Sequence, residues 1–72
     1  MTPDQITLRR NFGAIILAER TRQGLTQPDL AKLAGVSIPT ILTLEKGAKS
    51  TRIGSVLAIA AALGLSLSLV HE

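Results

Sequence analysis

The 72-residue chain has no cysteine, tryptophan or tyrosine, and Phe12 is its only aromatic residue. Without cysteine the chain has neither a disulfide framework nor a thiolate zinc site, which fits a reducing compartment. The lack of aromatic rings disfavours binding of single-stranded nucleic acid, because that binding needs several rings on which bases stack. The composition therefore excludes disulfide bonds and thiolate zinc sites as stabilising cross-links. It also disfavours a partner that is bound by base stacking.

Long hydrophobic runs are also missing. The longest, from Val56 to Leu65, is interrupted by Gly64 and is far shorter than the ~20 residues that a transmembrane helix needs. The first residues, MTPDQ, lack the basic start and apolar stretch of a signal peptide. We therefore expect one small cytoplasmic domain with no membrane contact.

Side chains suited to catalysis are scarce. His71 is the only histidine, and no glycine-rich phosphate loop is present. The acidic residues are few and scattered: Asp4, Glu19, Asp29, Glu45 and Glu72. No nucleophile, base and orienting group can be assembled from this set. We expect neither an enzyme nor a bound metal or cofactor.

The charge balance is modestly basic. Eight Lys and Arg residues against five Asp and Glu give a net charge of +3 and a pI near 10.2. Such an excess favours polyanionic partners, although many small proteins with no such partner carry as much.

Two stretches, LTQPDL (residues 25–30) and VSIPTI (residues 36–41), share one pattern of apolar, Ser or Thr, any, Pro, any, apolar. Thr26 and Ser37 stand where a helix N-cap belongs, and Pro is tolerated in the first turn. The flanking apolar pairs have the spacing of a hydrophobic staple, and Thr26 with Asp29 predicts a capping box. Both stretches therefore predict helix starts. Because Pro39 disfavours the α conformation at the preceding residue, a start one residue later is the alternative to a cap at Ser37.

Glycines mark the helix ends, and together these signals predict four helices. Their ranges are about 8–23, with Thr7 as a candidate cap, then 27–34, 38–46 and 52–63. The inward stripe of the first helix includes Ile15 and Ile16, and that of the last includes Ile53 and Leu57. For Gly13, inside the first helix, close packing is the simplest role.

The second and third predicted helices are short and are joined only by residues 35–37. Two short helices around a three-residue turn with glycine are typical of a helix-turn-helix unit. In DNA-binding versions of this unit, the N-terminal end of the second helix enters the major groove. The same pair can also serve as mere scaffolding, so the pattern alone leaves both roles open.

The segment GLTQPDLAKLAGVSIPTILTLEKG resembles the core of lambda-repressor-like (Xre-type) helix-turn-helix proteins. The matching positions are Gly24 to Gln27, Leu30, Ala31, Gly35 to Ser37, Leu44, Glu45 and Gly47. The resemblance runs from about Phe12 to Leu65. It implies an all-α bundle of four helices over residues 1–64, with residues 38–46 as recognition helix. It also implies a prokaryotic homodimer that represses transcription from a palindromic double-stranded DNA operator.

A second resemblance covers LEKGAKSTRIGSVLAIAAALGLSLSL, residues 44–69. This segment is similar to the antitoxin repressors of HipBA-type toxin–antitoxin modules. It implies an antitoxin that neutralises a HipA-like Ser/Thr kinase toxin and autoregulates the shared operon. The alternatives are a stand-alone phage-type repressor and a protein-binding adaptor that has lost DNA reading.

The resemblance also assigns candidate DNA contacts. Gln27 stands at the family's phosphate-contacting position, where its amide and the helix N-terminus meet one anion. Thr26 beside it serves mainly as the cap. The third helix should direct five residues toward the bases: Ser37, Ile38, Pro39, Thr40 and Thr43. Lys46, Lys49 and Arg52 flank the following loop and are expected to contact phosphates; a solvated loop is the alternative.

The apolar members of that helix depart from the usual pattern. Major-groove readers usually carry Arg, Gln, Asn or Ser, whereas this helix has Ile38, Pro39 and Leu42 on its outward side. These side chains are suited to thymine methyl groups, which leaves hydrogen bonding to the hydroxyl residues. The alternative is that this face docks on a protein.

The resemblance further implies an ion pair between Arg20 and Glu45 that ties the first helix to the end of the third. An Arg–carboxylate pair of this kind can be bidentate. As an ordinary surface pair it would contribute under ~1 kcal/mol.

The last segment, residues 65–72, alternates apolar and polar side chains through Leu65, Leu67 and Leu69. This alternation predicts a short β-strand. Because a lone strand is unstable and no other strand is predicted, it should pair with its twin across a homodimer. A frayed tail or a fifth short helix is the alternative.

Overall fold

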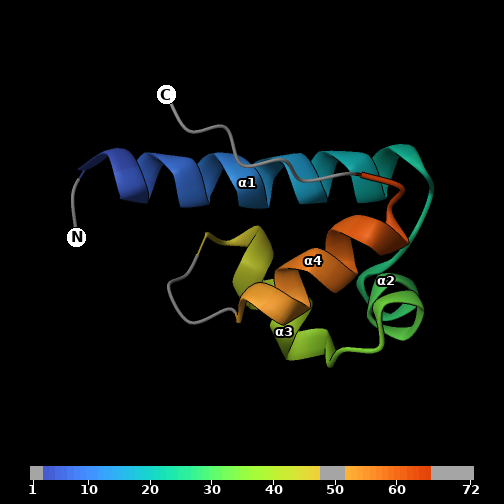
Figure 1. The fold of residues 1–72 in the computed structure, drawn as a ribbon. Helices are drawn as coiled ribbons and strands as arrows, with labels where there is room; N and C mark the ends of the chain where they lie inside the picture. The colour runs from blue at the N-terminus through green and yellow to red at the C-terminus, as the bar shows by residue number, and fades with distance from the viewer. Residues whose placement is uncertain (1–2, 48–51, 66–72) are drawn as a thin grey trace.

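The computed structural model describes residues 3–47 and 52–65, with the backbone alone for residues 3–11. The helices are α1 (Pro3–Arg22), α2 (Gln27–Ala34), α3 (Ile38–Glu45) and α4 (Ile53–Ala62). Figure 1 shows α1 as the long helix along the top of the view, with the three shorter helices grouped below it. The described residues form helices and contain no strand, in agreement with the predicted all-α class.

The start of α2 follows directly from its local sequence. Thr26 Oγ1 accepts from the backbone N–H of Asp29 at 3.1 Å, and Asp29 Oδ2 accepts from the backbone N–H of Thr26 at 2.9 Å. This is the predicted capping box, and the bond from the Thr26 N–H lowers the pKa of the Asp29 carboxyl. The bounds of α2 are those predicted.

The start of α3 is equally local. Ser37 Oγ accepts from the backbone N–H of Thr40 at 3.3 Å, which makes Ser37 the N-cap despite Pro39. Gly35 ends α2 with φ 70°, a left-handed conformation that a side chain would disfavour. The chain therefore turns into α3 over residues 35–37. Helix α3 ends at Glu45, one residue earlier than predicted, with Lys46 as its C-cap.

The first helix begins earlier than predicted. It starts at Pro3 and not near residue 8, so Thr7 lies inside the helix and is not its cap. Proline suits the first helical turn because its ring presets φ and its missing N–H would have had no partner there.

The last helix is slightly shorter than predicted, from Ile53 to Ala62 and not from 52 to 63. Arg52 is its N-cap, and no side chain makes a capping hydrogen bond there. Of the helices described here, none is both long and apolar enough to cross a membrane.

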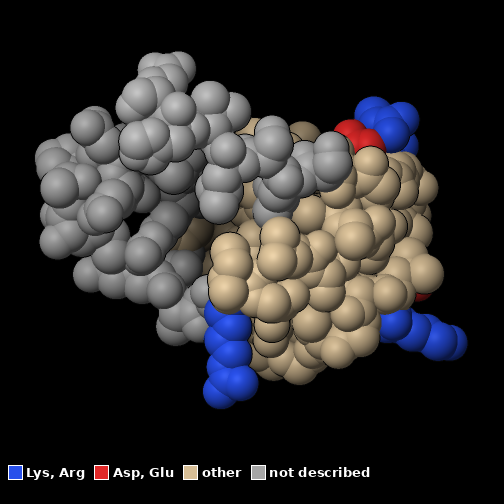
Figure 2. Space-filling view, viewed as in Figure 1, with Lys and Arg blue, Asp and Glu red and all other residues tan. Residues whose placement is uncertain are grey.

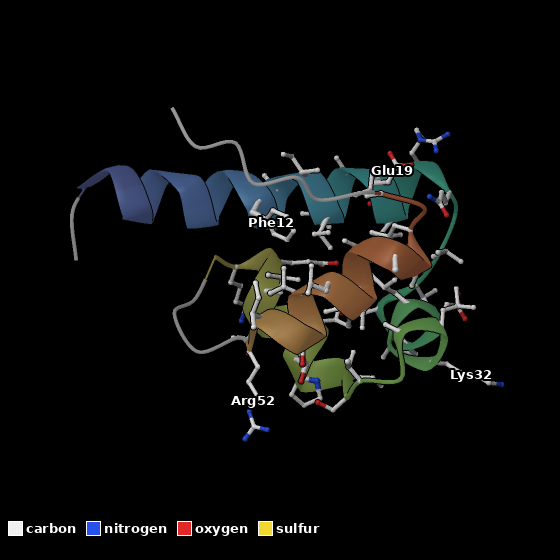
Figure 3. The ribbon with its side chains drawn as sticks, viewed as in Figure 1. Phe12, Glu19, Lys32 and Arg52 are labelled. Atoms are coloured by element: carbon white, nitrogen blue, oxygen red, sulfur yellow. The ribbon has the colours of Figure 1, made fainter. Side chains whose placement is uncertain are left out.

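Each helix contributes one large, fully buried side chain to a single core: Ile16, Leu30, Ile41 and Ile59. Burial of such a side chain stabilises the fold by roughly 1.5–3 kcal/mol. Figure 3 shows Phe12 on the side of α1 that faces the shorter helices, where it packs against this core.

Three residues predicted to face inward do not. Ile53 is 72% exposed, and Ile15 and Leu57 are also largely exposed. Successive helix residues are ~100° apart, so Ile15 is turned well away from its buried neighbour Ile16. In so small a bundle each helix is covered on one side only, and the buried stripe is narrower than the apolar stripe.

Gly13 lets α1 and α3 approach closely. A Cβ atom at this position would lie 2.4 Å from the backbone oxygen of Leu44 and 2.9 Å from that of Glu45. Carbon and oxygen do not approach so closely without a clash, so any side chain would push the helices apart. Close packing is thus the role of Gly13, and it fixes the end of α3 against α1.

Candidate nucleic-acid interface

Helix α3 has two different faces. Ile41 and Leu44 are buried in the core, and Val36 in the preceding turn packs against it. On the other side Ile38 is 41% exposed, and Leu42 is exposed as well. The outward surface of α3 is therefore largely apolar.

The hydroxyl groups at the start of this face are partly used within the protein. Ser37 Oγ and Thr40 Oγ1 lie 2.8 Å apart and share a hydrogen bond, in addition to the capping bond from the Thr40 N–H. Two hydroxyls carry two protons, and their mutual bond uses one of them. One O–H donor therefore remains for an outside acceptor. Pro39 between them is exposed, and Thr43, one turn later, is half-buried.

Two of the three predicted phosphate-contacting cations are described. Lys46 is the C-cap that follows α3, and Arg52 precedes α4; both are exposed, and neither forms an ion pair with another described residue. Figure 3 shows Arg52 extending away from the helical body. Lys49 lies outside the described residues.

Positive charge is scattered on the face drawn in Figure 2. Over α4 the described part of this face shows no charged residue, and its Lys and Arg side chains stand at the margins. The labels in Figure 3 place Arg52 and Lys32 at two separate margins. On the described part of this face the cations therefore stand singly.

Arg20 and Glu45, paired by the resemblance, are joined by a bidentate contact. Arg20 Nε donates to Glu45 Oε2 at 2.7 Å, and Arg20 Nη2 donates to Oε1 at 3.1 Å. The Arg20 side chain is 12% exposed and that of Glu45 only 4%. Hydrogen bonds to Glu45 raise the pKa of Arg20. Arg20 Nη1 also donates to the backbone oxygen of Leu25 at 2.8 Å, which ties the α1–α2 loop to the pair.

Gln27 also bonds to Glu45, and the sequence did not predict this contact. Its Nε2 donates to Glu45 Oε1 at 3.1 Å, so the expected phosphate donor is also bonded inside the protein. Thr26, the other candidate at this helix start, has its hydroxyl in the capping box. No sequence signal marks the Gln27–Glu45 bond, because it joins residues 18 positions apart.

The ends of α1 and α4 are joined by a second bond that the sequence did not reveal. Gln23 Nε2 donates to the backbone oxygen of Leu63 at 2.8 Å. Leu65, predicted to serve dimerisation, is half-buried and packs against the core of its own chain. Leu67 and Leu69 lie outside the described residues, as does the predicted strand beyond Leu65. Among the described residues, no group of three or more His, Cys, Asp or Glu is placed to hold a metal ion.

Comparison with known proteins gives a matching family model and a similar protein. A family model described as helix-turn-helix matches residues 16–70. A protein of Sinorhizobium fredii named "Uncharacterized HTH-type transcriptional regulator y4mF" is 37% identical over 60 residues. That alignment covers 83% of this chain and 79% of the relative. The range matched by the family model contains α2, α3 and the turn between them.

Proposed function

The chain belongs to the helix-turn-helix family, and from that premise we propose that it binds duplex DNA and regulates transcription. The observation that carries this proposal is the outward face of α3, which no other described helix covers while its opposite face is buried. An α-helix fits the major groove, and a helix anchored on one side offers the other for reading bases. The name of the S. fredii relative, a transcriptional regulator, supports the same function.

The contacts divide into two kinds. Gln27, Lys46 and Arg52 are suited to phosphates, which position the protein but carry no sequence information. Ile38 and Leu42 are suited to thymine methyl groups, and the O–H donor left by the Ser37–Thr40 pair can reach one base acceptor. The proposed function is therefore binding and not catalysis.

Fluorescence anisotropy with a duplex from the gene's own upstream region, against a scrambled duplex of equal composition, tests this function. Wild type should prefer the upstream duplex. Leu42→Ala should cost about 1 kcal/mol on that duplex and little on the scrambled one, as for a lost base contact. Leu33→Ala is the matched control, because Leu33 is an exposed leucine on α2. Equal losses of affinity in both variants, or a wild type that does not prefer the upstream duplex, would show that α3 does not read the bases.

The cation at the end of α3 offers an independent test. Lys46→Ala should weaken binding to both duplexes by similar factors. It should also reduce the slope of log K against log salt by about one unit, since one phosphate contact releases about one counterion. An unchanged slope would exclude Lys46 from the interface.

We propose further that the regulator is a homodimer on a palindromic operator. Support comes from the alternation through Leu65, Leu67 and Leu69 and from the absence of any strand among residues 3–47 and 52–65 to receive it. Because Leu65 packs against the core, the truncation that tests this role begins after it. Deleting residues 66–72 should shift the protein from dimer to monomer in sedimentation. A dimer that survives the deletion would assign dimerisation elsewhere.

The finer role that we propose is the antitoxin of a HipBA-type module, acting as repressor of its operon. Its support is the resemblance of residues 44–69 to those antitoxins. Co-expression with the neighbouring gene should yield a complex with a HipA-like kinase on affinity purification. Recovery of the protein alone, from cells that make both, would leave a stand-alone repressor.

A second candidate function rests on the apolar side chains of α3. Exposed Ile38 and Leu42 also suit a protein partner, as expected of an adaptor that has lost DNA reading. The anisotropy experiment separates the two, because an adaptor would show no preference for the upstream duplex.

A further inference from the structure

Three side-chain hydrogen bonds converge on the Glu45 carboxylate. Arg20 supplies two of them, at 2.7 and 3.1 Å, and the third comes from Gln27 Nε2 at 3.1 Å. Gln27 is the first residue of α2, whereas Glu45 is the last of α3. The nearly buried carboxylate thus reaches from the end of α3 to the start of α2, where the proposed phosphate contact lies.

The bond to Glu45 determines which way the Gln27 amide is turned. A carboxylate only accepts hydrogen bonds, so the amide nitrogen and not the amide oxygen must face it. The nitrogen carries two protons and gives one to Glu45. Among the described residues, Gln27 makes no other side-chain hydrogen bond, so its second N–H remains to donate.

That remaining donor is the chemistry that a phosphate requires. Phosphate oxygens are acceptors, so a glutamine can bind one only through its N–H groups. A glutamine with no internal partner would sample several rotamers and would present its oxygen as readily as its nitrogen. Ordering such a side chain on binding costs about 0.5–1.5 kcal/mol, which corresponds to roughly a twofold to twelvefold loss of affinity.

We propose that Glu45 is a positioning residue for DNA binding, which holds the Gln27 amide with one N–H directed at a phosphate. Arg20 completes the arrangement: its guanidinium compensates the Glu45 charge, which would otherwise oppose an approaching phosphate. This inference rests on the proposed DNA-binding function. It gives the family ion pair a second role, beyond holding α1 against α3.

The test removes the ion pair without changing the net charge. Arg20→Met with Glu45→Leu replaces both partners of a largely buried pair by apolar side chains, an exchange that often leaves stability nearly unchanged. Arg22→Gln with Glu19→Gln is the matched control, because it removes the exposed ion pair of α1 with the same change in charge and leaves Gln27 untouched. Each background is measured with and without Gln27→Ala, on the upstream and scrambled duplexes, below the onset of thermal unfolding.

The expected result is a coupling between the two sites. In wild type and in the control background, Gln27→Ala should weaken binding to both duplexes by about threefold to tenfold, a loss within the cost of ordering a side chain. In the Arg20→Met, Glu45→Leu background the same change should have almost no further effect. A role confined to stability would change melting but not this coupling. Equal effects of Gln27→Ala in all backgrounds would overturn the proposal.

A measurement on free wild-type protein covers the case in which the double variant does not fold. The side-chain amide of Gln27 should give a motionally restricted NMR signal, whereas an unheld glutamine has an order parameter below about 0.6. A mobile Gln27 amide overturns the positioning role. Because this readout needs no DNA, it distinguishes failure of the inference from failure of the proposed function, which would appear as wild type that binds neither duplex.

Discussion

Replacing Gly13 with alanine should destabilise the fold, although this exchange normally stabilises a helix. The new Cβ would lie 2.4 Å from the Leu44 oxygen, so α1 and α3 must separate by at least about 0.6 Å to reach 3.0 Å. Forcing extra atoms into a packed contact costs about 1–3 kcal/mol, and a backbone oxygen cannot rotate away. Better helix propensity returns up to about 1 kcal/mol. Because the clash is with backbone, we expect a cost in the upper half of that range, about 2–3 kcal/mol, and after subtraction of about 1 kcal/mol a net loss of about 1–2 kcal/mol.

Thermal melting followed by circular dichroism is the assay. For a domain of this size each kcal/mol lowers the melting temperature by about 4–8 °C, which predicts a drop of about 5–15 °C. Gly54→Ala is the control, because Gly54 is also helical but has open space where its Cβ would stand. That variant should gain up to about 1 kcal/mol. If Gly13→Ala melts at or above wild type, the contact between α1 and α3 is not as close as described.

Three further predictions concern the charged and polar side chains. A double-mutant cycle between Arg20 and Glu45 should give a coupling of about 1.5–3 kcal/mol, the range for hydrogen bonds to charged groups, and a value near zero would mean that the pair contributes nothing. The bonds from Arg22 and Gln23 lower the pKa of Glu19 from 4.5 to about 2, so its contribution to stability is present above pH 4.5 and is lost as the pH falls toward 2. Glu19→Gln should therefore flatten the loss of stability in acid, and an unchanged acid titration of stability would contradict this. Thr43→Ala should cost about 1–3 kcal/mol on the operator and little on random DNA, whereas equal losses on both would remove Thr43 from base reading.

The starts of α2 and α3 were the most predictable part of the fold. Thr26 with Asp29 and Ser37 with the Thr40 N–H make their hydrogen bonds across three residues. Such contacts form as soon as the chain adopts its first helical turn, whatever surrounds it. The bounds of α2 and the turn at residues 35–37 follow from them. The helix-turn-helix identification could therefore be made before any tertiary contact was known.

The outward faces were less predictable. Ile53 and Leu57 fit an apolar stripe that reads as buried, yet both are exposed. The pattern of a single helix says which residues are apolar, but not how wide an arc the neighbouring helices cover. The same holds for the candidate site: the resemblance assigns Gln27 to a phosphate contact, but its bond to Glu45 depends on how α2 and α3 pack.

By itself the sequence determined α2, α3, their caps and the family resemblance, because each rests on residues within one or two turns of one another or on a local motif. The sequence suggested close packing for Gly13 and a pair between Arg20 and Glu45, but only the tertiary structure decided what Gly13 packs against and that Glu45 also holds Gln27. Gly13 is required because residues far along the chain, at the end of α3, pass beside it. Glu45 meets Arg20 and Gln27 because the packing of α1, α2 and α3 brings three distant positions to one carboxylate. Contacts of that kind depend on how helices cross, and a crossing is a property of the whole core and not of any one segment.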